Sequence, residues 1–280
     1  MVHLFDIDHY LARIRFDGRR EPSLDTLVRL QAAHLVWVPF ENLHVFHRLG
    51  VRVDVDWSYQ KIVEQRRGGW CFELNGCFAE LLRRLGYSVE LLSCRTFEPA
   101  TGGLSPDFDH ATLLVHVNDT AYLVDVGWGD SPLAPVPAES GDYPTRPRPA
   151  RIETDSSTVR LLESVEQADG TAAWELQYQA SRHPRQLAQF EGRSRYLQTE
   201  PGLSWTEKPL ATRATSAHGG RVTLHRDRLR VRNDDLSIHD KVVPAEQWEA
   251  ELRTWFEMGI PTVAARSGET SFGRLSTIRP

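Results

Sequence analysis

The sequence predicts an α+β protein with three consecutive regions, because the spacing of its apolar residues changes twice along the 280 residues. Up to about residue 86, apolar positions recur at helical intervals. From 87 to about 190, short apolar-rich runs separated by turn residues indicate strands. After 190, two strands precede a helix. We therefore expect domains at 1–86, 87–190 and 191–280.

Four helices are expected in the first region. Apolar spacing places one around residues 10–16, and Ser23 is a suitable N-cap for a second helix that follows it. A third should lie around residues 57–63. The fourth should begin near Cys71 and end at Gly86, because glycine commonly terminates a helix.

Strands dominate the second region, with a turn at Asn118-Asp119 that predicts a hairpin. The strands are expected at 89–92, 111–117, 121–126, 159–162 and 174–178. The proline-rich passage from Ser131 to Pro149 is predicted to be a long connection without strands. In the third region we expect strands at 221–225 and 229–232, a helix at 244–256 and a tail over the last twenty residues.

Composition narrows the possible classes of protein. The net charge of −5 argues against general nucleic-acid binding. The sequence has no signal-peptide pattern and no apolar run of about 18 residues, so we expect no membrane association. The three cysteines are an odd number and lack a Cys-x-x-Cys spacing. This argues against a disulfide framework and against a zinc site, and favours a reducing, cytoplasmic setting with no metal.

The segment Arg67-Gly-Gly-Trp-Cys-Phe-Glu-Leu-Asn-Gly76 is the strongest indication of chemistry. Its glycine pair predicts a tight loop, and the apolar spacing after Cys71 places that residue at the start of a helix. Unpaired backbone N–H groups and the helix dipole favour a thiolate there, so we expect a lowered pKa for Cys71. The motif therefore predicts a cysteine nucleophile.

A cysteine nucleophile needs a base and a group that orients the base. His110 stands at the start of one expected strand and Asp125 near the end of the next, and the hairpin at Asn118-Asp119 would bring them together. A carboxylate within an apolar strand needs a hydrogen-bond partner, which an imidazole supplies. The sequence thus predicts a Cys71-His110-Asp125 triad.

These segments resemble the arylamine N-acetyltransferase family. The resemblance rests on Arg67 to Asn75, Pro39-Phe-Glu-Asn-Leu43, His110-Ala-Thr-Leu-Leu-Val115 and Leu123-Val-Asp-Val-Gly-Trp-Gly129. It implies an N-terminal helical bundle carrying the cysteine, a β-barrel-like middle domain carrying histidine and aspartate, and a C-terminal α/β lid. It also implies a papain- or transglutaminase-like Cys-His-Asp core.

The implied reaction is acetyl transfer from acetyl-CoA to an arylamine, arylhydrazine or similar amine, in a ping-pong mechanism through acetyl-Cys71, with a role in xenobiotic metabolism. The resemblance pairs Arg67 with Glu41 as an architectural support of the site, and Asn75 is expected to support it through hydrogen bonds. The substrate pocket is expected to contain Phe40, Trp70, Phe108 and Trp128. CoA contacts are expected at Asp109, Gly129, Tyr196 and Ser204. The protein is expected to be a monomer or a homodimer.

Acidic residues near the triad set an expectation about substrates. Asp107 and Asp109 would repel CoA phosphates if their side chains faced them. Asp130 follows the Gly-Trp-Gly segment, and from these three acids together we expect carboxylated acceptors to be poorer than neutral arylamines or hydrazines. Two alternatives share the triad: an amide synthase that closes a polyketide macrolactam, and a transglutaminase-like cysteine hydrolase.

Overall fold

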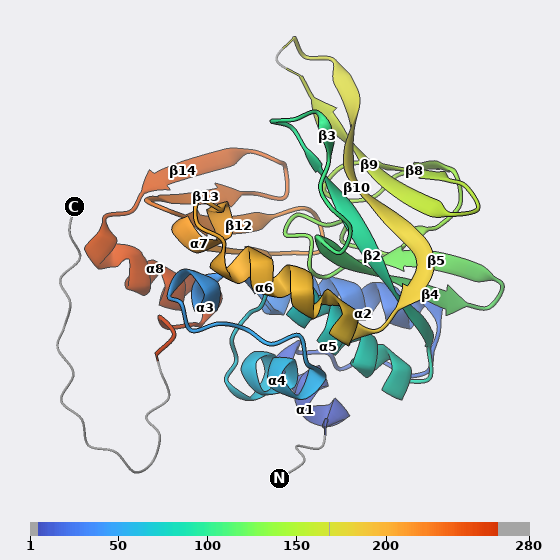
Figure 1. The fold of residues 1–280 in the computed structure, drawn as a ribbon, viewed down its shortest axis with the longest axis horizontal. Helices are drawn as coiled ribbons and strands as arrows, with labels where there is room; N and C mark the ends of the chain where they lie inside the picture. Colours follow the sequence, from blue (N-terminus) through green and yellow to red (C-terminus); the bar gives the residue numbers. More distant parts are fainter. Residues whose placement is uncertain (1–4, 168, 263–280) are drawn as a thin grey trace.

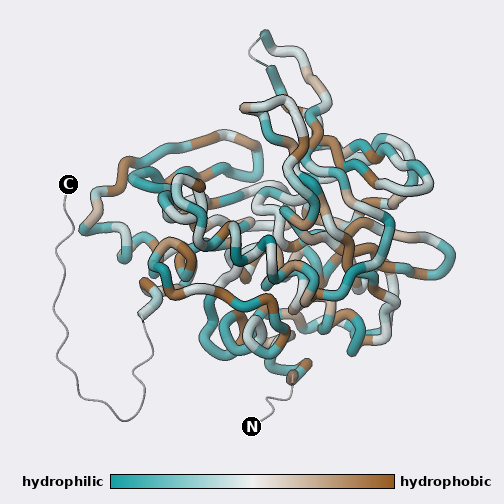
Figure 2. The backbone as a smooth tube through the Cα atoms, viewed as in Figure 1, coloured by the Kyte–Doolittle hydropathy of each residue, from teal (hydrophilic) through white to brown (hydrophobic). Residues whose placement is uncertain are grey.

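The structure, a computed structural model, describes residues 5–167 and 169–262. It is an α+β fold in which a helical region, a large curved sheet and a smaller sheet lie around a common centre (Figure 1). Figure 2 shows hydrophobic and hydrophilic residues interleaved along the chain, as expected for elements with one buried side and one exposed side. From residue 263 on, the expected tail lies outside the described residues.

The helical region consists of α1 (Ile7–Arg13), α2 (Leu24–Trp37), α3 (Leu43–Phe46), α4 (Val55–Tyr59) and α5 (Cys71–Arg84). The predicted cap of α2 is confirmed, because the Ser23 side chain accepts a hydrogen bond from the Thr26 N–H at 3.2 Å. Gly86, with φ of +92°, follows the end of α5 as expected. The predicted third helix is α4 followed directly by a π-helical turn, η1 (Gln60–Glu64).

The large sheet is antiparallel, with strand order β6-β5-β4-β2-β10-β9-β8-β7 and the short β3 paired to β2. Its strands are β2 (Ser88–Glu98), β3 (Gly103–Leu104), β4 (His110–Val117), β5 (Thr120–Val124), β6 (Val136–Pro137), β7 (Gly141–Tyr143), β8 (Ala150–Thr154), β9 (Thr158–Glu166) and β10 (Ala172–Arg185). The hairpin between β4 and β5 turns at Asn118, whose φ is +52°. The expectation of a strand-free passage over 131–149 is wrong, because β6 and β7 lie within it. Both are too short to show an alternating pattern.

The lid sheet, as we call the smaller sheet, has the order β1-β11-β12-β13-β14. Its strands are β1 (Phe40–Glu41), β11 (Leu210–Ala214), β12 (Arg221–His225), β13 (Arg228–Arg232) and β14 (Ile238–Val242). Because β1 comes from the N-terminal helical region and pairs with β11, the lid sheet connects that region to the C-terminal part of the described chain. Helix α8 (Trp248–Phe256), preceded by the 3₁₀ turn η3 (Ala245–Gln247), covers its apolar face.

Between the two sheets run η2 (Leu187–Phe190), α6 (Glu191–Thr199) and α7 (Ser204–Glu207), with α6 crossing the middle of Figure 1. The sequence prediction missed these helices, and it also missed β11 and β14. Strand β14 is exposed along its whole length, so burial imposes no apolar pattern on its sequence. None of the helices in the described part of the chain is long and apolar enough to cross a membrane.

Candidate active site

Cys71 is the first residue of α5, as its sequence context predicts. The loop before it passes so close to the backbone of another segment that only glycine fits at position 68, and position 69 is also tight. A Cβ on Gly68 would lie 2.2 Å from the Pro39 carbonyl oxygen, and one on Gly69 would lie 3.0 Å from the Glu73 side chain. Glu73 then caps the helix by accepting a hydrogen bond from the Trp70 N–H at 3.2 Å. The loop and the cap together fix the position of Cys71.

His110 and Asp125 are held together by the β4–β5 hairpin. His110 begins β4 and Asp125 directly follows β5, and His110 Nε2 lies 2.6 Å from Asp125 Oδ2. Both side chains are buried. Burial raises the pKa of Asp125, but His110, the Asn75 amide and the Gly127 N–H together outweigh it and hold the pKa below its usual value. Asp125 is therefore an ionised partner for the imidazole.

Cys71 and His110 line one cavity of about 260 Å³, which we call the Cys71 cavity. Of the residues expected to contact substrates, Phe40, Asp109, Trp128 and Gly129 line it. No substrate or CoA contact was predicted for the other lining residues: Thr96, Phe97, Gly127, Trp205, Leu210 and Thr212. The lid sheet and α7 thus supply a wall that residue spacing alone could not locate.

Four residues expected at the substrate or CoA sites do not line this cavity. Trp70 packs edge-on against Phe72. Phe108 contacts Phe190 in the same manner, with ring centroids 5.0 Å apart. Tyr196 is 42% exposed on α6. Ser204 begins α7, and it is the next residue, Trp205, that reaches the cavity.

The environment of Cys71 does not lower its pKa. Burial raises the pKa of the thiol well above its usual value, and the carboxylates of Asp109 and Asp125 raise it further. The backbone N–H groups of Ala111 and Phe72 act in the opposite direction. The expectation of a lowered pKa is thus wrong for the thiol by itself, because desolvation and two nearby negative charges outweigh the helix terminus.

The carboxylate of Asp109 has a cationic partner. Its Oδ1 accepts from Arg193 Nη2 on α6 at 2.6 Å, and its Oδ2 accepts from the Thr96 hydroxyl at 2.8 Å. The neighbouring Asp107 lies 3.7 Å from the guanidinium of Arg185. Both acids are therefore paired with arginines, which weakens the repulsion expected toward an anionic substrate.

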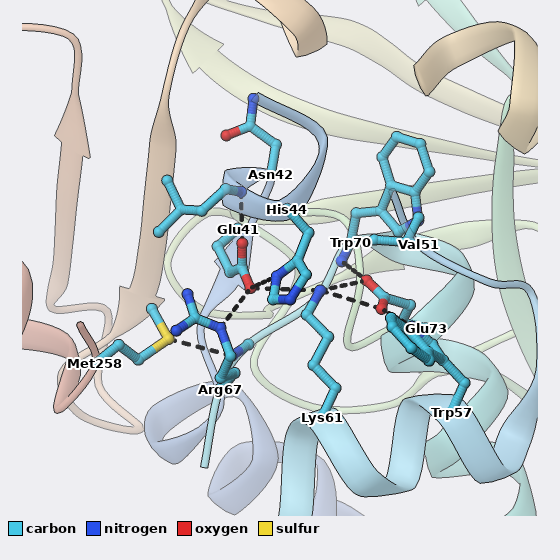
Figure 3. A network of polar contacts seen from close by, with 12 residues as sticks. Glu41, Asn42, His44, Val51, Trp57, Lys61, Arg67, Trp70, Glu73 and Met258 are labelled. Atoms are coloured by element: carbon cyan, nitrogen blue, oxygen red, sulfur yellow. Dashed lines mark hydrogen bonds and ion pairs between the residues drawn. The ribbon is translucent and has the colours of Figure 1, made fainter. Parts of the chain in front are cut away.

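A buried ionic network supports the loop that carries Cys71 (Figure 3). The predicted pair is present but long, with Arg67 Nε 3.9 Å from Glu41 Oε1. Lys61 lies nearer, with its Nζ 3.4 Å from the same oxygen and 2.8 Å from Glu73 Oε2. Lys61 is only 2% exposed and comes from the π-helical turn η1. Because a lysine on a helix normally faces solvent, no pattern in the sequence indicated this role.

Asp130 is surrounded by arginine side chains, which its position in the sequence did not indicate. Its carboxylate lies 2.6 Å from Arg221 Nε, 2.7 Å from Arg232 Nη1 and 3.0 Å from Arg148 Nη1. These guanidinium groups hold the pKa of Asp130 far below its usual value, against the effect of burial. Three positive charges thus surround the single negative charge of Asp130, which offsets the repulsion expected from this residue toward carboxylated acceptors.

Comparison with known proteins shows which family the chain belongs to. A family model described as N-acetyltransferase matches residues 23–264. The chain belongs to the arylamine N-acetyltransferase family. It is 37% identical over 205 residues to the arylamine N-acetyltransferase of Mycolicibacterium smegmatis, covering 70% of this chain and 72% of that one. It is 32% identical over 226 residues to the pineal gland isozyme NAT-3 of Gallus gallus, covering 75% and 78%.

Solved structures of arylamine N-acetyltransferases have the same fold. The enzyme from Salmonella typhimurium superposes with a TM-score of 0.83 at 25% identity, covering 94% of both chains. The Mycobacterium marinum enzyme in complex with CoA gives a TM-score of 0.80 at 27% identity, covering 90% of this chain and 92% of that one. The chain is accordingly an acyltransferase, and CoA thioesters are its donor class. In the described part of the chain, no group of three or more His, Cys, Asp or Glu side chains is placed to hold a metal.

Proposed function

We propose that Cys71, His110 and Asp125 form a catalytic triad that moves an acetyl group from acetyl-CoA to an arylamine or arylhydrazine by a ping-pong mechanism. One observation carries the proposal: Asp125 engages His110 Nε2 at 2.6 Å, while His110 and Cys71 line the same cavity. Since Nε2 is occupied, Nδ1 is the nitrogen available to take the Cys71 proton. The Asp125 carboxylate stabilises the imidazolium that forms.

In the first half-reaction, His110 Nδ1 takes the proton from Cys71 Sγ, and the sulfur attacks the thioester carbonyl carbon. A tetrahedral intermediate forms and collapses by breaking the bond between that carbon and the CoA sulfur. The imidazolium returns its proton to the departing CoA thiolate. The products are acetyl-Cys71 and free CoA.

In the second half-reaction, the amine nitrogen attacks the acetyl carbon of the acyl-enzyme. His110 removes a proton from the nitrogen, and the carbon–sulfur bond to Cys71 breaks as the amide forms. The proton then returns to the thiolate, which restores the enzyme. Phe40, Trp128 and Trp205 give the cavity aromatic walls that suit an arylamine ring.

The raised pKa of the thiol makes the pairing with His110 necessary. A buried cysteine with two carboxylates nearby forms little thiolate by itself. Transfer of its proton to His110 produces a thiolate–imidazolium pair that stays neutral overall, and Asp125 favours the imidazolium. Cys71, Cys77 and Cys94 are all unpaired thiols in the structure.

The experiment is to mix the protein with acetyl-CoA alone and record its intact mass. We expect an adduct of about 42 Da, the mass of an acetyl group that replaces hydrogen, together with stoichiometric CoA release. The adduct should be absent in Cys71→Ser and present in Cys77→Ser, because Cys77 lies six residues further along α5 and does not line the cavity. Addition of an aniline or hydralazine should remove the adduct and yield the acetylated amine.

The alternatives give different outcomes in the same assay. A cysteine hydrolase would lose the adduct to water before any amine is added. An amide synthase would be acylated by longer acyl thioesters and not by acetyl-CoA. No adduct and no CoA release with either class of acceptor would contradict the proposed acetyl transfer.

A further inference from the structure

The lid sheet has two chemically different faces. Along β12 and β13, Val222, Leu224 and Leu229 are buried on the side covered by α8. The residues between them, on the opposite side, are mainly arginine and threonine. Strand register places Arg221 beside Arg232 and Thr223 beside Arg230. The arginines therefore lie together on one face of the sheet, and their positions follow from the two-residue period of the strands.

This face borders a second cavity, of about 290 Å³, which we call the lid anion pocket. Its polar lining is Asp130, Thr212, Arg221, Thr223, Arg230 and Arg232. Gly129 and Thr212 line both this pocket and the Cys71 cavity. The two cavities are therefore neighbours that share part of a wall.

The pocket lies in a cluster with more guanidinium groups than carboxylates. Asp130 is shared by Arg148, Arg221 and Arg232, and Arg148 also contacts Glu163. Asp240 is likewise shared by Arg228 and Arg230. Among the residues that line the pocket itself, the three guanidinium groups of Arg221, Arg230 and Arg232 accompany the single carboxylate of Asp130, which leaves an excess of positive charge at its wall. Arg221 is only 6% exposed, so solvent screens its charge poorly.

Two of the pocket arginines, Arg221 and Arg230, each have a terminal nitrogen for which no hydrogen bond is found in the described chain. Arg221 donates through Nε to Asp130 and through Nη1 to the Thr212 hydroxyl. Arg230 donates through Nε and Nη2 to Asp240. Neither Nη2 of Arg221 nor Nη1 of Arg230 has a partner among residues 5–167 and 169–262. A planar guanidinium with unused donors at the wall of a cavity is suited to a carboxylate or a phosphate.

We propose that the lid anion pocket binds an anionic group, a carboxylate or a phosphate, carried by a substrate whose reacting end lies in the Cys71 cavity. The identity of the substrate rests on the proposed acetyl transfer, whereas the location of the anion site rests on the arginine face of the lid sheet. The proposal reverses the preference expected from Asp107, Asp109 and Asp130: where the acceptor supplies the anion, carboxylated arylamines are the better acceptors. Where the donor supplies it, a CoA phosphate occupies the pocket.

The test compares Arg230→Gln with Arg228→Gln. Both arginines come from β13, contact Asp240 and have side chains about half exposed, at 51% and 57%. Only Arg230 lines the pocket. Loss of an ionic hydrogen-bond donor to the bound anion should weaken its binding about tenfold, whereas the control should change it less than twofold.

Two matched substrate pairs identify the source of the anion. For acceptors, the Michaelis constant for para-aminobenzoate is divided by the constant for its methyl ester, which lacks the charge. For donors, the Michaelis constant for acetyl-CoA is divided by the constant for acetyl-pantetheine, which lacks the phosphates. A rise in the first ratio in Arg230→Gln identifies a carboxylate site and a rise in the second identifies a phosphate site. If neither ratio differs from that of Arg228→Gln, the proposal is wrong.

A binding titration separates this proposal from the proposed reaction. Equilibrium titration of the wild-type protein and both variants with CoA and with para-aminobenzoate needs no turnover. Weaker binding of either probe to Arg230→Gln would support the pocket even if acetyl-Cys71 never forms. Equal binding of both probes to all three proteins would overturn it even if Cys71 is acetylated. Arg221→Gln, checked for its Tm, should weaken the binding of the same probe as Arg230→Gln does.

Discussion

The Asn75 side chain ties the helix that carries Cys71 to the strand end that carries Asp125. Its Nδ2 donates to Asp125 Oδ1 at 2.9 Å and to the Ala111 carbonyl at 2.6 Å. Its Oδ1 accepts from the Val126 N–H at 3.0 Å. Asn75 lies one helical turn after Cys71, so a single amide fixes the helix against both strands of the hairpin.

Replacement of Asn75 by alanine should therefore affect both stability and catalysis. The change leaves the buried Val126 N–H and Ala111 carbonyl without this partner, which should cost about 2–4 kcal/mol in the free energy of unfolding. The rate of acetyl-Cys71 formation should also fall, since Asp125 loses one of its donors. Urea unfolding and intact-mass kinetics measure the two effects. Asn233→Ala, which removes only an exposed bond to Ser237, should change stability by less than about 0.5 kcal/mol.

Asp125→Asn should greatly slow acylation while keeping the fold. The new amide can still accept from Asn75, but it then offers an N–H to His110 Nε2. The imidazole must place its own proton on Nδ1, where it cannot act as a base toward Cys71. Single-turnover acetylation should fall by about 10²–10⁴-fold. A rate within about threefold of the wild type would show that Asp125 does not orient the base.

Asp109→Asn should make Cys71 more reactive at neutral pH. The negative charge of Asp109 raises the pKa of the thiol, and its removal leaves the Arg193 cation unpaired, so the pKa should fall. The midpoint of the pH profile for alkylation by iodoacetamide should move to lower pH. Asp107→Asn serves as the control, because Asp107 does not line the Cys71 cavity and is not among the main charges that shift this pKa. A midpoint that moves equally in both variants would contradict the role assigned to Asp109.

Lys61→Met should destabilise the protein strongly. It removes the cation that contacts buried Glu73 and leaves Glu41 with the more distant Arg67, and removal of one partner from a buried ion pair costs about 3–5 kcal/mol. Adding Glu73→Gln should recover part of the loss. Lys241→Met breaks an exposed pair with Glu251 and should cost less than about 1 kcal/mol. Chemical denaturation of the four proteins tests this order.

Stability should fall as the pH decreases below about 6.5, in part because of His34. Burial lowers the pKa of His34 to about 3, and nearby Arg13 acts in the same direction. Its ordinary pKa is 6.5, so the unfolded chain binds a proton that the folded protein excludes. The contribution is complete above pH 6.5 and is lost as the pH falls toward 3, with a slope of up to about 1.4 kcal/mol per pH unit. His34→Gln should reduce the measured slope by this amount, whereas His239→Gln on exposed β14 should not.

Much of the site could be predicted because its determinants are local. The glycine pair and the apolar spacing after Cys71 define a loop and a helix start within a short stretch of chain. The turn at Asn118 similarly aligns His110 and Asp125 within one hairpin, so their proximity follows from strand pairing. The family resemblance then supplied the fold, and solved arylamine N-acetyltransferase structures superpose on it with TM-scores of 0.81 and 0.83.

Other features of the site depend on contacts between distant segments. Trp205 and Thr212 reach the Cys71 cavity only because β1 pairs with β11, which brings Phe40 and Thr212 together. Lys61 faces inward from a π-helical turn, a geometry that residue spacing does not indicate. The electrostatic environment of the site also depends on distant contacts. Asp109 and Asp130 can be recognised as acids in the sequence, but the fold brings Arg193 to Asp109 and places three arginines around Asp130.

By itself, then, the sequence placed Cys71 at the start of a helix and His110 and Asp125 in one hairpin, and it indicated a helical region followed by a strand region, because short-range spacing and the polypeptide's own periodicities set these features. The tertiary structure decided the walls of the cavity, the pKa of Cys71 and the sign of the charge beside it. These quantities depend on burial and on distances between groups far apart in the chain, and desolvation and Coulomb interactions act through space, not along the sequence.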